Sequence, residues 1–432
     1  MPEHREWYKL DLSAIVYPTL QRRDFSSVYR LSVLMKEEVD PDLLQQAIDQ
    51  TMPRFPTYKA AMRRGLFWRY LEPNDRPGPF AQPDVKNPCQ PMNFIKNNRY
   101  LIRFYYYHNR ISLEAHHSLG DGTGGMCVLH TLIAEYLRLQ GHTEIQNGGF
   151  VMDVNEKPDP GELEDAYMKY ANSKICPPRP GEKTYRVRGT KEPFYTLNII
   201  DGIMSTSEVI KAAKSYNASI TEYLNAVLLY ALVKKQSKEW HVRLKPVRIA
   251  MPVNLRRFFP SKTLRNFITM IYPGVDPRLG EYTFEEIVTQ VHHYMRYYVN
   301  EKFLRADITT NARTQSHPLI RIVPLFLKDF VVRQFYTKVQ DRNSSAGLTN
   351  MGALQVNESM RPYIERFDIC MGQPFSSRTN CAIISFGDVL TINFASSIVE
   401  ADVERYFFRK LVKDGIHVKI ESNREIPDEE MI

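Results

Sequence analysis

Cysteine is scarce in this 432-residue chain. The five cysteines are Cys89, Cys127, Cys176, Cys370 and Cys381, and no two of them form a C-x-x-C motif. Their odd number and wide spacing argue against a disulfide framework and against a zinc site built on paired cysteines. We therefore expect reduced thiols and no bound metal.

Long hydrophobic runs are also missing. No apolar stretch is long enough to cross a bilayer, so we expect no transmembrane segment. Residues 1–20 lack the basic and apolar regions of a secretory signal. Together with the cysteine pattern, this predicts a cytoplasmic location.

Basic residues do not gather into a tail, although the formal net charge is +8. They occur as scattered pairs such as Arg22-Arg23 and Arg256-Arg257, and no motif for binding DNA or RNA is present. We expect no nucleic-acid partner. The charge fits a solvated surface, or a weak attraction for a small anionic molecule such as a phosphorylated cofactor.

The length exceeds what one hydrophobic core usually supports, which predicts two subdomains. Strand and helix patterns alternate along the chain, so the fold class is α/β or α+β. Around residues 153–189 the sequence becomes rich in proline, glycine and charge, which is typical of a crossover. We predict an N-terminal subdomain over residues 1–165, a linker over 166–190 and a C-terminal subdomain over 191–432.

Several elements have clear sequence signals. Asp40 and Pro41 predict the start of a helix that ends at Pro53. Capping-box patterns at Ser205 with Glu208, Ser219 with Glu222 and Thr283 with Glu286 each predict a further helix start. Other helices are predicted over 126–139 and 401–414, and strands over 100–107, 110–117, 194–200, 242–252, 382–386 and 389–395.

The segment His116-His117-Ser118-Leu119-Gly120-Asp121-Gly122 carries the strongest chemical signal. It joins the predicted strand 110–117 to the following helix. Because side chains alternate along a strand, His117 shares a face with Ile111, Leu113 and Ala115. His116 points to the opposite face, with Ser112 and Glu114. The two histidines are therefore not equivalent.

This segment has three possible interpretations. A metal site using both histidines is disfavoured, because neighbours on a strand point in opposite directions. A dinucleotide site matches Gly120-Asp121-Gly122-Thr123-Gly124-Gly125 literally, but Asp121 would face the pyrophosphate. Catalysis by one histidine fits best, since a neutral imidazole next to an apolar space is a general base near pH 7.

The pattern H-H-x-x-x-D-G resembles the signature of the CoA-dependent acyltransferase superfamily, which includes chloramphenicol acetyltransferase and the condensation domains of peptide synthetases. Other segments resemble the superfamily in the same order, and the nearest resemblance is to stand-alone bacterial alcohol acetyltransferase-like proteins. The segments are residues 42–48 with Arg54-Phe55-Pro56, residues 250–256 with Arg265-Asn266-Phe267, and residues 347–352.

The resemblance implies two chloramphenicol acetyltransferase-like subdomains that form a V, with the active site in a tunnel between them. It implies that His117 is the catalytic base and that Asp121 has a structural role, paired with an arginine for which Arg256 is the candidate. Gly122 would let the backbone approach the histidine. Thr349 or Asn350 could stabilise the oxyanion.

The implied reaction is direct transfer of an acyl group, expected to be acetyl, from a CoA thioester to a hydroxyl acceptor, without an acyl-enzyme. Acyl-CoA is then a co-substrate, and no cofactor stays bound. Two alternatives remain open. One is a condensation-type enzyme that forms an amide from a carrier-protein thioester supplied in trans, and the other is a non-catalytic relative that binds a ligand.

Overall fold

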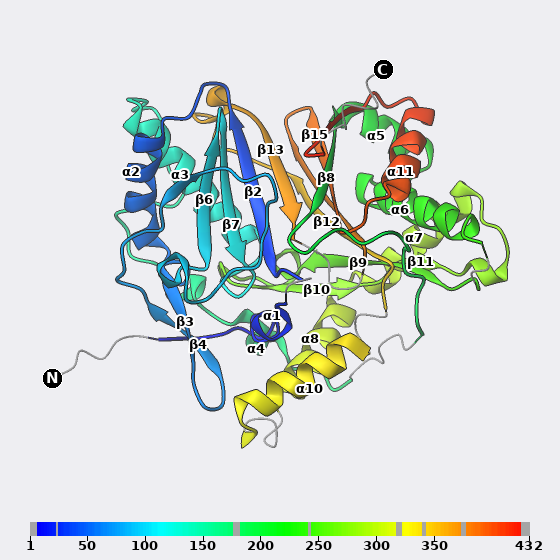
Figure 1. Ribbon diagram of the computed structural model, residues 1–432, viewed down its shortest axis with the longest axis horizontal. Helices are drawn as coiled ribbons and strands as arrows, with labels where there is room; N and C mark the ends of the chain where they lie inside the picture. The colour runs from blue at the N-terminus through cyan, green and yellow to red at the C-terminus, as the bar shows by residue number, and fades with distance from the viewer. Residues whose placement is uncertain are drawn as a thin grey trace.

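Two β-sheets lie side by side, with helices on their outer sides (Figure 1). The computed structural model describes residues 7–22, 25–175, 182–240, 243–316, 322–338, 343–372 and 377–424. In this part of the chain, no helix combines the length and apolarity that a membrane crossing needs. The predicted mixed α/β class is confirmed.

The first sheet has five strands in the order β13-β2-β7-β6-β5. They are β2 (Val28–Met35), β5 (Ala81–Pro83), β6 (Ile102–Tyr107), β7 (Arg110–His116) and β13 (Ile364–Met371). Helices α2 (Pro41–Thr51) and α3 (Gly122–Leu139) pack against each other and cover this sheet. The predicted N-cap of α2 is confirmed, because the Asp40 carboxylate accepts hydrogen bonds from the backbone N–H groups of Asp42 and Leu43.

Helix α3 begins four residues earlier than predicted, at Gly122 instead of Met126. Glycine is a poor helix former, and Gly122, Gly124 and Gly125 all lie in this first turn. The Asp121 side chain caps the turn by accepting hydrogen bonds from two of its backbone N–H groups. With this cap the helix begins at Gly122, and only residues 117–121 separate it from β7.

The second sheet has the order β10-β9-β12-β14-β15-β8-β16, and β11 also pairs with β9. Its strands are β8 (Asn198–Ser205), β9 (Val247–Asn254), β10 (Ile268–Ile271), β11 (Gly274–Val275), β12 (Ala346–Ala353), β14 (Thr379–Phe386), β15 (Val389–Ser396) and β16 (Lys419–Ser422). Its helices are α5 (Thr206–Ser215), α6 (Ile220–Ser237), α7 (Phe284–Tyr298) and α11 (Asp402–Lys413). The predicted capping boxes of α6 and α7 and the predicted β14–β15 hairpin are confirmed.

Two strands of the second half were predicted out of place. β8 runs from Asn198 to Ser205 because it pairs along its full length with β15, whereas Phe194 is exposed and Tyr195 has a positive φ. β9 starts at Val247 and continues through Pro252. A proline is tolerated at position 252 because β12 pairs with β9 only at Ile249 and Ala250, before the strand reaches this proline. Val242, where that strand was predicted to start, is outside the described residues.

The capping box predicted at the start of α5 forms only in part. The Ser205 hydroxyl accepts a hydrogen bond from the Glu208 backbone N–H. The Glu208 carboxylate accepts a hydrogen bond from the backbone N–H of His417 at 2.8 Å. Glu208, the second residue of the predicted capping box, therefore binds the segment that leads to β16.

One strand crosses between the two halves of the sequence. β13 comes from late in the chain, yet it pairs with β2 in the first sheet and packs against β14 and β15 of the second. The two sheets therefore meet along β13. The boundaries near residues 165 and 191 stay a prediction, and residues 176–181 of the expected linker are outside the described residues.

A third group of elements lies below the two sheets in Figure 1. It holds a small sheet of β1 (Tyr8–Lys9), β4 (Arg69–Pro73) and β3 (Ala60–Arg64), together with α1 (Tyr17–Leu20), α4 (Ala166–Tyr170), α8 (Glu301–Ser316) and α10 (Leu325–Lys338). Helix α1 lies between α10 and the first sheet.

His130 of α3 gives a prediction about acid stability. Its ring is buried between Phe150 and Phe367, and burial lowers its pKa to about 4. The unfolded chain therefore binds a proton near pH 6.5 that the folded chain takes up only near pH 4, so stability is lost as the pH falls between these values. We expect His130→Phe to remove about 2 kcal/mol of the loss in unfolding free energy between pH 7 and pH 5.

Urea unfolding at both pH values measures this difference. The exposed His293 on α7 supplies the control variant His293→Phe. An equal pH dependence in wild type and His130→Phe would contradict the expectation.

Candidate active site

A cavity of about 680 Å³ lies between the two halves of the molecule. It opens where β9 and β12 part, because their pairing ends at Ala250 and Gly347. The following residues of both strands, Met251–Asn254 and Thr349–Ala353, line the cavity. Residues 26–29 of the first half and the segment from Asp121 to Thr123 form the opposite wall. The cavity is thus built from both sheets.

His117 lies at the end of β7 and lines this cavity. Its backbone N–H donates to the Ser27 carbonyl at 2.8 Å, which continues the pairing of β7 with β2 by one residue. Its ring stacks on Tyr17, with ring centroids 4.8 Å apart, and lies 4.7 Å from the ring of Tyr29. Neither tyrosine was assigned a role from the sequence, since both come from distant segments of the chain.

The electrostatic environment keeps the His117 ring neutral. Burial lowers its pKa to about 4, and the charge of Asp121 opposes this shift only in part. Nδ1 is buried and has no hydrogen-bond partner among the described residues.

His116 points away from the cavity, as strand alternation predicts. Ser118 contacts its Nδ1 through both the backbone N–H and the hydroxyl, and Phe94 covers the ring edge-on. Burial lowers its pKa to about 3. The face of β7 that carries Ser112, Glu114 and His116 is polar, and these three residues are fully buried. There the Glu114 carboxylate pairs with Arg30 at 2.8 Å.

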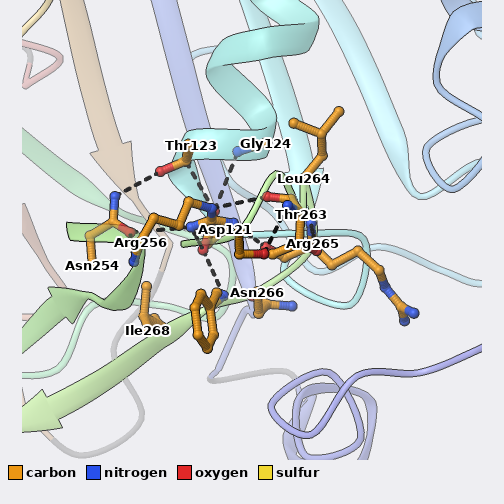
Figure 2. A network of polar contacts seen from close by, with 12 residues as sticks. Asp121, Thr123, Gly124, Asn254, Arg256, Thr263, Leu264, Arg265, Asn266 and Ile268 are labelled. Carbon is orange, nitrogen blue, oxygen red and sulfur yellow. Dashed lines mark hydrogen bonds and ion pairs between the residues drawn. The ribbon is translucent and has the colours of Figure 1, made fainter. Parts of the chain in front are cut away.

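Asp121 joins the two halves through contacts with the start of α3 and with the segment between β9 and β10 (Figure 2). Oδ1 accepts hydrogen bonds from the N–H groups of Thr123 and Gly124 at the start of α3. Oδ2 accepts one from Arg256 Nη1 at 2.8 Å and one from the backbone N–H of Phe267 at 2.9 Å. Only 2% of Asp121 is exposed, so the ion pair is almost fully removed from water. The two carboxylate oxygens thus serve different halves of the molecule.

Asn266 holds the backbone of the histidine segment. Its side-chain amide donates to the His117 carbonyl at 2.8 Å and to Asp11 Oδ2 at 3.0 Å. Asn266 belongs to the segment Arg265-Asn266-Phe267, which resembles the acyltransferase superfamily, and no role is predicted for it from the sequence. Its contacts join residues far apart in the chain, so only the folded arrangement shows them.

The glycines at and after the H-H-x-x-x-D-G motif leave space for residues other than His117. A Cβ on Gly122 would lie 2.8 Å from Met351 Sδ of β12, so the space it leaves faces the second half and not the His117 ring. A Cβ on Gly124 would collide with the Leu264 carbonyl and with the Tyr58 hydroxyl. These glycines allow α3 to pack closely against the second half.

Thr349 and Asn350 line the cavity across from the first-half wall. The Asn350 amide is engaged on both sides, since Nδ2 donates to Thr221 Oγ1 at 2.9 Å and Oδ1 accepts from Gly352 N at 2.8 Å. No hydrogen bond of the Thr349 hydroxyl is found within the described residues, and its side chain stays partly exposed.

The fold has clear counterparts among solved structures. Polyketide synthase associated protein 5 from Mycobacterium tuberculosis has a TM-score of 0.61 at 14% identity, over 94% of this chain and 97% of that one. The TRI3 trichothecene 15-O-acetyltransferase from Fusarium sporotrichioides has a TM-score of 0.60 at 12% identity, over 94% of each chain.

The wax ester synthase/diacylglycerol acyltransferase from Marinobacter aquaeolei VT8 reaches 0.56 at 12% identity, over 94% of this chain and 98% of that one. No family model and no curated sequence matches the chain. At these identities the similarity establishes the fold: the chain has the fold of the condensation-domain and chloramphenicol acetyltransferase-like acyltransferases, as the sequence resemblance predicted.

The Asp121 network makes a prediction about stability. Asp121→Ala removes the cap of α3 and leaves Arg256 buried without its anion, which typically costs about 3–5 kcal/mol. Asp40→Ala is the matched control, because Asp40 also caps a helix through two backbone N–H groups but forms no ion pair with any described residue. We expect Asp40→Ala to lower the free energy of unfolding by about 1 kcal/mol. Urea unfolding of both variants gives the comparison, and equal losses would show that the ion pair adds nothing.

Proposed function

We propose that this protein is a CoA-dependent acyltransferase that uses His117 as general base. The observation that carries the proposal is a neutral histidine on the wall of a cavity that both sheets line. The similarity in fold to a trichothecene 15-O-acetyltransferase and to a wax ester synthase supports acyl transfer as the type of reaction. A related fold, a starter condensation domain, is known in complex with C8-CoA, which supports a CoA thioester as donor.

The reaction proceeds by direct attack. Nε2 of His117 takes the proton of the acceptor hydroxyl while the acceptor oxygen attacks the thioester carbonyl. The tetrahedral intermediate then collapses, the carbon–sulfur bond breaks, and the proton passes from His117 to the CoA thiolate. Nothing is attached to the enzyme at any step, so the products are an ester, taken to be an acetyl ester, and free CoA.

Thr349 is the better candidate for stabilising the oxyanion. Its hydroxyl can turn toward the cavity, whereas both ends of the Asn350 amide are already bound. Asn350 then acts as a positioning residue that holds Thr221 against β12. Asp121 and Arg256 are positioning residues as well, because their contacts fix the turn that follows His117 and leave no carboxylate oxygen free for proton transfer.

The main alternative differs from the proposed reaction in its acyl donor and its acceptor. A condensation-type reaction would use the same histidine on an amine acceptor, with the thioester delivered by a carrier protein in trans. The similarity to condensation domains keeps this second candidate open. A protein that only binds a ligand would not need a neutral histidine on the cavity wall.

Replacing His117 tests the proposal directly. We expect His117→Ala to lower kcat/KM for thiol release from acetyl-CoA, over a panel of alcohols and amines, by about 10²- to 10⁴-fold. His293→Ala, on the exposed surface of α7, should leave the rate unchanged, and circular dichroism should show that both variants fold. Full activity in His117→Ala would remove this residue from the mechanism. A lack of activity in wild type with any CoA or carrier donor would favour the ligand-binding alternative.

The pH dependence gives a second test. A base with a pKa of about 4 stays neutral well below the usual histidine pKa of about 6.5. We therefore expect kcat/KM to be constant from pH 8 down to pH 5 and to fall only as the pH approaches 4. Tryptophan fluorescence at each pH identifies any loss caused by unfolding. An acidic limb centred near 6.5 in folded enzyme would contradict the environment described for His117.

A further inference from the structure

Helix α10 presents an apolar face to solvent. Phe326 is 60% exposed, Leu327 45%, Phe330 63% and Val331 62%. Because successive residues turn by 100° around a helix, these four positions form one continuous stripe. Large apolar side chains that gather in this way usually mark an interaction surface.

The polar side of α10 faces the protein and fixes the helix in this orientation. The Asp329 carboxylate accepts two hydrogen bonds from Arg69, at 2.8 and 2.6 Å, and one from Thr19 Oγ1 at 2.9 Å. Lys328 Nζ donates to the Phe67 carbonyl at 2.9 Å. A rotation that buried the apolar stripe would break this largely buried ion pair, so the stripe must point outward.

The turn between β3 and β4 extends the apolar surface. Leu66 is 69% exposed and Trp68 is 52% exposed, and the Leu66 carbonyl accepts a hydrogen bond from the backbone N–H of Leu325 at the start of α10. In Figure 1 this turn and α10 reach the lowest part of the molecule. We use the name docking face for the following residues: Leu66, Trp68, Phe326, Leu327, Phe330 and Val331.

The charge around the docking face is positive. Arg63, Arg64, Arg69, Lys328 and Arg333 carry five positive charges against the two negative charges of Glu72 and Asp329, which leaves an excess of three. The Arg64 side chain is 62% exposed beside the turn. An anionic partner would gain from this field.

We propose that the docking face binds an anionic lipid surface. Its tryptophan, phenylalanine and leucine side chains project from a helix and a hairpin turn, and basic residues lie beside them, which is the arrangement of helices that lie in a membrane interface. Each of these apolar side chains is at least 45% exposed, so they can enter a soft lipid layer.

The helix that carries most of the docking face is linked to the candidate active site through α1. The Arg333 guanidinium donates to the Thr19 carbonyl at 3.1 Å, and Asp329 binds the Thr19 hydroxyl, so α10 holds α1. Helix α1 carries Tyr17, which stacks on His117. This position would bring apolar substrates from a membrane close to the cavity. That consequence rests on the proposed function, whereas the docking itself does not.

Flotation with vesicles of phosphatidylcholine, with and without phosphatidylglycerol, tests the proposal on the full chain. We expect binding to the anionic vesicles that weakens as salt is added. The double variant Phe326→Ser/Phe330→Ser should bind at least about tenfold more weakly, because two aromatic rings no longer enter the lipid. The matched control is Trp240→Ser/Leu279→Ser, which removes two other side chains that are 84% and 81% exposed and should bind like wild type.

Three results would overturn the proposal: wild type fails to bind anionic vesicles, the phenylalanine variant binds them as well as wild type does, or the variant changes only self-association, measured by sedimentation. The last result would make the docking face an interface between copies of this chain. The binding measurement needs no turnover, so its outcome is independent of the proposed reaction.

Discussion

The contacts of one carboxylate determine how the two halves of the molecule meet. Asp121 follows the turn after β7, and its Oδ1 starts α3 by capping two backbone N–H groups. Its Oδ2 binds Arg256 and the Phe267 backbone, both from the segment between β9 and β10. The same side chain therefore caps the helix that follows the His117 turn and binds the loop between β9 and β10. The cavity lies beside these contacts, where β9 and β12 separate.

A buried ion pair contributes little net stability by itself, because the desolvation of both charges offsets most of their attraction. The value of the Asp121–Arg256 pair lies in its further hydrogen bonds. Arg256 Nε donates to the Thr263 carbonyl at 2.9 Å, so the guanidinium fixes the loop that leads to Asn266. Asn266 in turn holds the His117 carbonyl. The Asp121–Arg256 pair thus helps to position the backbone of His117. It also contributes to the burial that keeps the His117 imidazole neutral.

Local signals in the sequence predicted much of this structure. The period of two along β7 separated His117 from His116, and the capping patterns located the starts of α2, α6 and α7. Other features depend on contacts between distant segments and have no local signal. β13 joins β2 although more than 300 residues separate them, and Tyr17 and Asn266 reach His117 from other elements. The space at Gly122 was attributed to the wrong neighbour, because Met351 approaches it from the second half.

The position of Tyr17 also depends on contacts between distant segments of the chain. Helix α1 has only four residues, too few to be stable without tertiary contacts. Its backbone and its Thr19 hydroxyl are bound by Arg333 and Asp329 of α10. The contacts of Lys328, Asp329 and Arg333 fix one side of α10 against the protein, and the opposite side of that helix is apolar and exposed. The ring that stacks on His117 and the apolar stripe on the surface are thus two consequences of one set of polar contacts.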